Sequence, residues 1–184
     1  KNPAVPMLWR VGVLTSEPER VGEALLARGL RDAGTVPALA LMPGQLVSSP
    51  PPLEMTVKVV RTPCEVIDWL EPYCTCFDLN YTIRSHFEQF IKDRLDSSHD
   101  EAWFVGYVES QPVCCAYYLT TSEITVIYNV ATLSNFRNLG YGRSIVEAAV
   151  NHAWQYSTYP IALYSSEMGL SVYRKIGFSD VYRL

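Results

Sequence analysis

The chain has 184 residues, of which 48% are hydrophobic and 18% charged, and its formal net charge at pH 7 is −4. This composition is typical of a globular domain, and a chain of this length can bury a sizeable core without disulfides or metal ions. The small negative charge gives no electrostatic reason to expect nucleic acid or an anionic membrane as a partner. No stretch reaches the roughly 18 apolar residues of a membrane span, and no signal peptide is visible, so we expect a cytoplasmic protein.

The first elements along the chain are predicted to be a strand, a helix and a strand. Apolar runs and apolar residues at helical spacing place them at residues 7–14, 19–30 and 36–42. Three consecutive prolines follow, Pro50, Pro51 and Pro52, and these can neither continue a helix nor pair in a central strand. We therefore predict an extended linker that separates two parts of the chain. The parts are an N-terminal β-α-β segment, the linker and the main domain, over residues 1–47, 48–52 and 53–184.

The elements after the linker predict an α/β (α+β) fold, a mixed sheet with helices on its faces. Strands are predicted over residues 53–59, 103–108, 113–119, 124–132, 161–165 and 181–184. Helices are predicted over residues 64–77, 83–95, 140–156 and 170–175. Gln111 and Pro112 indicate the turn of a hairpin, and Gly177 indicates the end of the last helix.

Five cysteines are present, an odd number without C-x-x-C spacing, so neither a disulfide framework nor a zinc site is predicted. We expect reduced, buried thiols and no metal. The cysteines are Cys64, Cys74, Cys76, Cys114 and Cys115.

The most informative segment lies between the strand over 124–132 and the helix that follows it. It reads Arg137-Asn138-Leu139-Gly140-Tyr141-Gly142-Arg143-Ser144. A helix start offers unpaired backbone N–H groups and a partial positive charge, both of which suit a phosphate. Gly140 and Gly142 let the backbone approach a ligand closely, and the two arginines can add charge-assisted hydrogen bonds. The alternative interpretation is that the glycines only open a helix, because an R-x-x-G-x-G string alone is common.

Two motifs together resemble the GNAT acyltransferase superfamily. Residues 128–142 are similar to its motif A, a strand that leads into [RQ]-x-x-G-x-[GA], and residues 173–178 are similar to its motif B, Y-x-x-x-G-F. The interval between them accommodates one helix and one strand, as the family requires. A closer resemblance is to a bacterial subgroup with Y-N-V-A-T before the loop and S-x-M-G-x-x-V-Y-R near the end. In that subgroup the N-terminal extension resembles a degenerate half of a second GNAT unit, which implies that the 1–47 segment is a partial repeat.

The resemblance implies a site for acetyl-CoA or another acyl-CoA. Val130, Ala131 and Thr132 would lie along the pantetheine arm, with backbone groups of Val130 and Thr132 pairing with it. Residues 137–142 would surround the pyrophosphate, with Arg143 and Ser144 extending this cradle. Ser166 would contact the pantetheine or the thiol.

Tyr173 matches the general acid of the family, which donates to the departing thiolate. The alternative is a tyrosine that only packs against the core. No general base is identified: Glu123 precedes the expected strand, Asn129 cannot act as a base, and Glu167 is more simply a surface charge. His86, His99 and His152 have no predicted catalytic partner. Aromatic residues of the 64–95 segment could line an acceptor pocket or only pack helices on the sheet; they are Trp69, Tyr73, Phe77, Tyr81 and Phe87.

We therefore expect an N-acetyltransferase that moves an acetyl group from acetyl-CoA to an amine of a small molecule or peptide, by direct attack in a ternary complex. An alternative is a non-catalytic acyl-CoA-binding regulatory module, and a third reading is that the loop binds nothing. Neither nucleic acid nor a membrane is expected as a partner, and a homodimer is left open.

Overall fold

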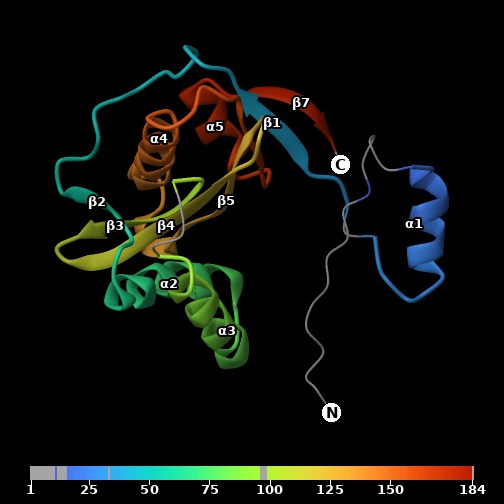
Figure 1. Cartoon of the computed structure of the whole chain (residues 1–184), viewed down its shortest axis with the longest axis horizontal. Coiled ribbons are helices and arrows are strands. Elements are labelled where there is room, and N and C mark those ends of the chain that lie inside the picture. The colour runs from blue at the N-terminus through green and yellow to red at the C-terminus, as the bar shows by residue number, and fades with distance from the viewer. Residues whose placement is uncertain (1–10, 12–15, 33, 96–98, 184) are drawn as a thin grey trace.

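The computed structural model describes residues 11, 16–32, 34–95 and 99–183, and they form a mixed sheet flanked by helices (Figure 1). The strand expected over residues 7–14 falls outside these residues, apart from Val11. The elements in chain order are α1 (Pro18–Leu26), β1 (Pro37–Leu41), β2 (Met55–Val59), α2 (Pro63–Phe77), α3 (Tyr81–Lys92), β3 (Glu101–Val108), β4 (Gln111–Thr120), β5 (Thr125–Thr132), the 3-10 turn η1 (Ser134–Phe136), α4 (Tyr141–Ala153), β6 (Ile161–Tyr164), α5 (Leu170–Ile176) and β7 (Ser179–Arg183).

The sheet has seven strands in the order β2-β3-β4-β5-β6-β1-β7. The pair β5–β6 is parallel, and the other neighbours are antiparallel. Helix α4 packs on one face, while α2 packs on β3, β4 and β5 from the other (Figure 1). The expected α/β class and the mixed central sheet are confirmed.

Local sequence signals explain where the helices begin. Thr62 and Glu65 form a reciprocal capping box at the start of α2, in which the Thr62 hydroxyl accepts from the Glu65 N–H and the Glu65 carboxylate accepts from the Thr62 N–H. Pro63 occupies the first turn, where its missing N–H costs nothing. Asn80 caps α3 by accepting from the Ile83 N–H.

The hairpin between β3 and β4 is confirmed, but its predicted turn at Gln111-Pro112 is wrong. The turn consists of Glu109 and Ser110, both with positive φ, 49° and 68°, as a two-residue turn of this kind requires. Gln111 and Pro112 begin β4 instead. Pro112 is tolerated there because the β3–β4 register shifts between Gly106 and Tyr107, next to the partner of the proline.

Strand β1 precedes the proline linker, yet it lies inside the sheet of the main domain. It pairs antiparallel with both β6 and β7, for example Leu39 with Leu163 and Ala38 with Tyr182. The sheet therefore extends across the expected division of the chain at residues 48–52. That β1 comes from a partial GNAT repeat remains a prediction.

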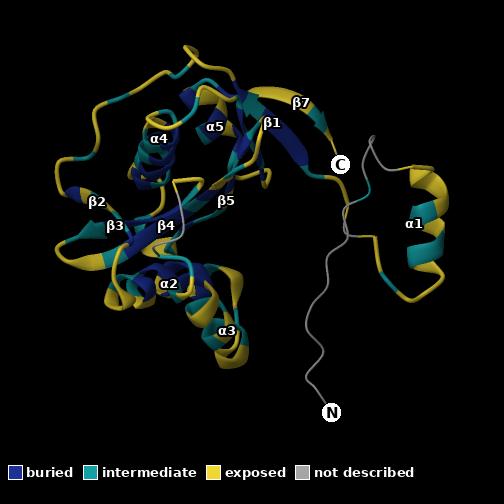
Figure 2. Ribbon diagram, in the orientation of Figure 1, coloured by how far each residue is buried: buried dark blue, intermediate teal, exposed yellow. Residues whose placement is uncertain are grey.

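The core consists of two apolar layers, one on each face of the sheet (Figure 2). The larger layer joins α4 and α5 to the sheet and includes the fully buried Leu39, Ile145 and Ile176. The smaller layer lies under α2 and α3, around Trp69, whose indole N–H donates to the carbonyl of Ala116 at 2.9 Å. Helix α1 has no buried residue.

The five cysteines are unpaired thiols. Cys74, Cys114 and Cys115 are buried as expected, whereas Cys76 is half-buried and Cys64 is exposed. Burial raises the pKa of Cys114 to about 12 and that of Cys115 well above its usual range, so neither is a ready nucleophile.

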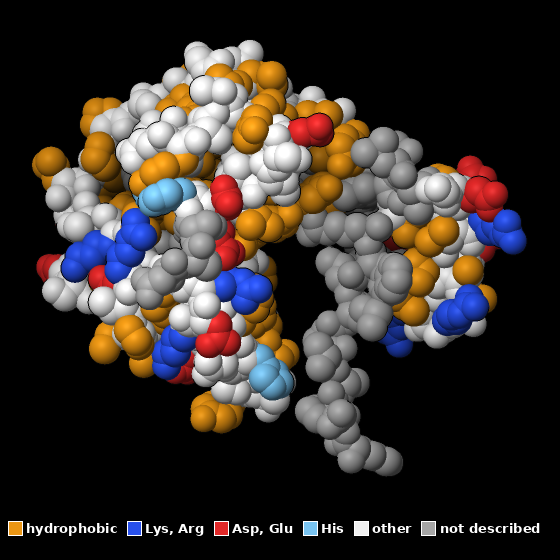
Figure 3. All heavy atoms as spheres, viewed as in Figure 1, with side chains coloured by type: hydrophobic (Ala, Val, Ile, Leu, Met, Phe, Trp, Pro, Cys, Tyr) orange, Lys and Arg blue, Asp and Glu red, His pale blue; other side chains and the backbone are white. Residues whose placement is uncertain are grey.

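On the face shown in Figure 3, acidic and basic side chains are interspersed rather than gathered by sign. Within the described ranges, no helix is long and apolar enough to cross a membrane. The same residues contain no group of three or more His, Cys, Asp or Glu placed to hold a metal ion.

Candidate active site

The candidate site begins where β5 and β6 separate. Their parallel ladder joins Thr125–Ile127 to Ile161–Leu163, and β5 then continues for five residues to Thr132. Asn129 lies at this point with φ 54°, and the β4–β5 register shifts between Cys115 and Tyr117, which marks a bulge. A bulge changes the direction of the strand, so the edge of β5 after the bulge is not paired with β6.

The last residues of β5 direct alternate backbone groups toward that edge. The Leu133 N–H donates to the carbonyl of Val113 in β4, at 3.0 Å. Because backbone groups alternate between the two sides of a strand, those of Val130 and Thr132 point away from β4. The Thr132 carbonyl accepts from the Arg137 Nε at 3.1 Å and from the Cys76 thiol at 3.3 Å.

The end of β5 leads through η1 into the N-terminus of α4. Gly140 occupies the N-cap position with φ 87°, a left-handed conformation that favours glycine, and no side chain caps the helix. The first intrahelical bond runs from the Ser144 N–H to the Gly140 carbonyl, so the N–H groups of residues 141–143 face the loop. A Cβ on Gly142 would lie 3.2 Å from the Thr132 hydroxyl, so this glycine permits the close approach of helix and strand.

The two predicted phosphate arginines lie in different surroundings. Arg137 is exposed, and its Nε bond to Thr132 holds it at the end of β5. Arg143 instead pairs with Glu147 one turn along α4, and it donates from Nη2 to the carbonyl of Val47 at 2.7 Å. Of the other predicted loop residues, Asn138 has φ 63° and Leu139 is 52% exposed.

Tyr173 lies on α5, which follows β6 and packs against α4. The residue is 9% exposed, and burial raises the pKa of its phenol to about 12. Its ring contacts Phe178 edge-on at 5.9 Å between centroids. The phenol is therefore protonated at neutral pH and has its proton to donate.

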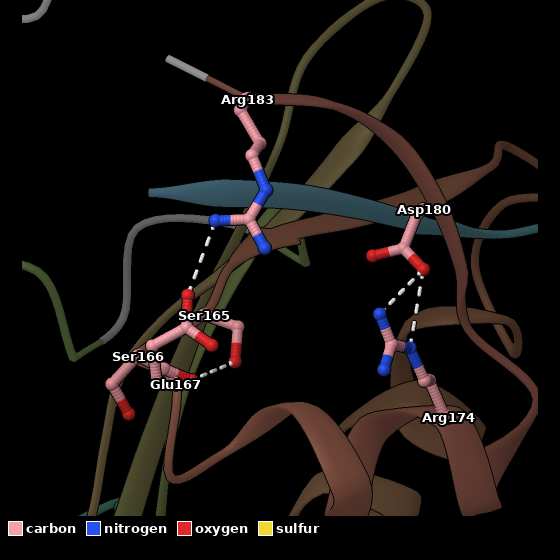
Figure 4. A network of polar contacts seen from close by, with 6 residues as sticks. All are labelled: Ser165, Ser166, Glu167, Arg174, Asp180 and Arg183. Atoms are coloured by element: carbon pink, nitrogen blue, oxygen red, sulfur yellow. Dashed lines mark hydrogen bonds and ion pairs between the residues drawn. The ribbon is translucent and has the colours of Figure 1, made fainter. Parts of the chain in front are cut away.

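Ser166 belongs to the turn that starts α5 (Figure 4). Its carbonyl accepts from the Ser165 hydroxyl at 2.7 Å and from the Gly169 N–H at 3.0 Å, and its own hydroxyl accepts from the same N–H at 3.3 Å. A Cβ on Gly169 would lie 2.8 Å from the Tyr173 ring, so the turn and the tyrosine are packed tightly together. Ser166 thus belongs to the turn whose Gly169 packs against Tyr173.

The structure brings no carboxylate candidate for a general base to Tyr173 in the described part of the chain. Glu167 is exposed and pairs with Arg183 of β7 at 3.1 Å (Figure 4). Glu123 lies in the loop before β5, at the strand end opposite the phosphate loop. Asn129 forms the bulge, where its carbonyl accepts from the Cys115 thiol.

His86 is exposed on α3, whereas His99 and His152 contact aromatic side chains. His152 bonds the Tyr118 hydroxyl at 2.9 Å and meets the Phe104 ring edge-on. Its pKa is lowered by burial, with further contributions from Arg61 and His99. His99 stacks on Tyr156 at 4.2 Å.

The aromatic residues of α2 and α3 differ in exposure. Trp69 and Tyr73 are buried, and their rings contact each other at 4.8 Å, which is packing of helix on sheet. Phe77 and Tyr81 are 51% and 82% exposed. Phe90 is 42% exposed, whereas Phe87 is half-buried and contacts the Tyr73 ring at 5.1 Å. The exposed rings are the ones that could meet an acceptor.

Two residues of the site had not been predicted. The Cys76 thiol contacts Thr132 at the expected pantetheine edge, although the cysteine lies 56 residues away in sequence. Glu147 is 7% exposed and pairs with Arg143. The i,i+4 spacing of Glu147 from Arg143 could have predicted this ion pair from the sequence. No local sequence feature predicted that Cys76 contacts β5.

Comparison with protein families gives a match over part of the chain. Residues 99–180 match the family described as "Acetyltransferase (GNAT) domain", a stretch that contains both predicted motifs. Over this stretch the chain is similar to the GNAT family, in agreement with the resemblance of its two motifs. A comparison with curated proteins found no match.

Solved structures share this fold. A GCN5-related N-acetyltransferase from Kribbella flavida has a TM-score of 0.66 and 19% identity, over 87% of this chain and 60% of that chain. Glucosamine-6-phosphate N-acetyltransferase from Arabidopsis thaliana has a TM-score of 0.58 and 18% identity, over 69% and 94%. A predicted acetyltransferase from Clostridium acetobutylicum, solved with acetyl-CoA, has a TM-score of 0.59 and 17% identity, over 69% and 91%. This chain thus spans less than two thirds of the Kribbella protein's length.

Proposed function

We propose that the protein is an acetyl-CoA-dependent N-acetyltransferase. The observation that carries the proposal is the edge of β5 that leads, beyond its separation from β6, into an α4 N-terminus without a side-chain cap. Such an edge can pair with the amides of an extended pantetheine arm, and the helix N-terminus can bind the pyrophosphate that follows that arm.

The residues present suit each part of the ligand. Backbone groups of Val130 and Thr132 would pair with pantetheine, beside Ala131. The N–H groups of residues 141–143 and the terminal nitrogens of Arg137 would bind the pyrophosphate. Asn138, Leu139, Gly140 and Ser144 would complete the loop around it.

In the proposed reaction the acceptor nitrogen attacks the thioester carbonyl, the C–S bond breaks, and the thiolate of CoA leaves. The Tyr173 hydroxyl donates its proton or a hydrogen bond to the departing sulfur. The acceptor nitrogen loses its proton to solvent. Holding donor and acceptor together supplies most of the rate enhancement.

The test is the melting temperature with and without acetyl-CoA, with desulfo-CoA and ATP as comparison ligands. Acetyl-CoA at a hundred times its dissociation constant should stabilise the fold by about 2.7 kcal/mol, which for a chain of this size corresponds to roughly 5–11 °C. A shift of this size with acetyl-CoA, and little with ATP, supports the proposal and is followed by a product assay on a panel of amines. No shift at millimolar acetyl-CoA contradicts it.

One observation favours a second candidate, a regulatory module that binds acyl-CoA without catalysis. Glu167, the carboxylate in the turn before α5, is paired with Arg183 and exposed. This candidate predicts the same thermal shift but no acetylated product with any amine of the panel.

A further inference from the structure

The segment between β1 and β2 is held along both motifs rather than crossing solvent as a free linker. Its first contact is with the end of α5, where the Val47 N–H donates to the Ile176 carbonyl at 2.8 Å. A Cβ on Gly177 would lie 2.2 Å from the Gln45 carbonyl, so the segment passes against the glycine of motif B.

The same segment next contacts the first two turns of α4. The Val47 carbonyl accepts from Arg143 Nη2 at 2.7 Å, and the Ser49 N–H donates to the Glu147 carboxylate at 3.2 Å. Arg143 and Glu147 also bind each other, with side chains only 23% and 9% exposed. The two side chains therefore form a clasp that holds the backbone of residues 47–49.

The last contacts are at the phosphate loop itself. Pro52 lies beside Gly140, at 3.5 Å from the position of a Cβ on that glycine. The Tyr141 hydroxyl donates to Glu54 at 2.7 Å, a bond that lowers the pKa of the Glu54 carboxyl. One segment thus contacts motif B at its glycine and motif A at its loop.

We propose that residues 45–54 are a strap that holds the phosphate loop in its binding geometry, and that Arg143 is a positioning residue of this strap rather than a phosphate ligand. The guanidinium of Arg143 already binds a nearly buried carboxylate and a backbone carbonyl. Turning it to a phosphate would leave Glu147 without its charge partner, which is costly at low exposure. Arg137, exposed at the end of β5, is the arginine placed to meet the phosphate.

The proposal rests on the proposed function for its ligand, but the strap can be tested without one. We would measure amide hydrogen exchange in ligand-free wild type, Arg143→Ala and Glu147→Ala. Release of the strap should speed exchange at Ser49 by about tenfold or more, because a hydrogen bond to a charged acceptor is lost. Exchange at Ser144, whose N–H binds Gly140, should rise as well. Arg84→Ala, which breaks the Arg84–Glu71 pair between α3 and α2, is the matched control and should leave both amides unchanged.

The second measurement is the dissociation constant of acetyl-CoA for the same variants and for the double variant. If a loosened loop is competent for one tenth of the time, the apparent affinity falls by about tenfold. Both single variants should show this loss of affinity. The double variant should lose no more affinity than either single variant, because both substitutions break the same Arg143–Glu147 contact to the strap. Glu147→Gln keeps the side-chain shape and should fall between wild type and Glu147→Ala if the alanine variant folds poorly.

A direct phosphate ligand predicts the opposite behaviour. Glu147→Ala would then free Arg143 and leave affinity equal or higher, while Arg143→Ala would lower affinity and also weaken its dependence on salt. That pattern, or unchanged exchange at Ser49 in both variants, would overturn the strap. A wild type that does not bind acetyl-CoA would instead refute the proposed function, and exchange at Ser49 and Ser144 would still decide whether the strap exists.

Discussion

Tyr173 illustrates how burial sets the chemistry of a single side chain. Its pKa is raised from an ordinary value of 10 to about 12, so the phenol keeps its proton throughout the range in which an enzyme works. The raised pKa also makes the stability of the fold depend on pH. Relative to Tyr173→Phe, the folded protein should lose stability as the pH rises from about 10 to about 12, because the unfolded phenol ionises first.

For Tyr173→Phe we expect turnover to fall by about a hundredfold or more, the usual scale of general acid catalysis, with little change in acetyl-CoA affinity. The substitution removes only the donor and keeps the packed ring. Steady-state kinetics with an acceptor found in the panel, together with a binding isotherm, separates the two quantities. If affinity drops and turnover holds, Tyr173 is a packing residue and not the acid.

At the scale of an element, the junction of α5 and β7 depends on Gly177. Its φ of 112° is poorly accessible to other residues, and a Cβ would meet the Gln45 carbonyl at 2.2 Å. The glycine therefore ends the helix and leaves room for the strap beside it. Only the first of these two roles could be predicted from the sequence.

Gly177→Ala should lower the free energy of unfolding by at least about 1–3 kcal/mol, the cost of a strained backbone position. Urea denaturation measures this change. Gly22→Ala is the control, because that glycine lies inside α1 with open space around it, and alanine there should be neutral or stabilising. Equal effects of the two substitutions would contradict both the strain and the contact with Gln45.

At the scale of the whole molecule, β1 makes residues before the linker part of the main sheet. Leu39 and Leu41 are fully buried, and burial of each contributes on the order of 1.5–3 kcal/mol. The strand also pairs with both β6 and β7. Strand β7, whose register pairs are with β1, has no other neighbour in the sheet order.

Deleting residues 1–52 should therefore abolish cooperative unfolding, whereas deleting residues 1–34 should keep it, since β1 remains. Circular dichroism melts of the two truncated proteins provide the comparison. If the chain from residue 53 onward melts cooperatively near the full-length temperature, the expected domain boundary is right and β1 is dispensable.

Much of the fold was predictable because its signals are local. The apolar spacing of α2, the β-branched run of β5 and the glycine after α5 each determine an element within a few residues. The two motifs likewise predicted the similarity to the GNAT family, since each motif is a continuous stretch of chain. The hairpin turn was placed two residues late, because Pro112 is a strong turn signal and the register shift that accommodates it depends on the partner strand.

The sequence by itself determined the order of the elements after residue 34 and the loop that we propose for acyl-CoA, because these depend on neighbouring residues and short-range periodicity. Only the tertiary structure decided that β1 lies between β6 and β7, that Cys76 reaches Thr132, and that Arg143 is engaged by Glu147 and the linker backbone. Each of these depends on contacts between residues far apart in the chain or on the direction of one side chain. Several side chains in the sequence are chemically equivalent as partners, and the tertiary packing decides which of them come into contact.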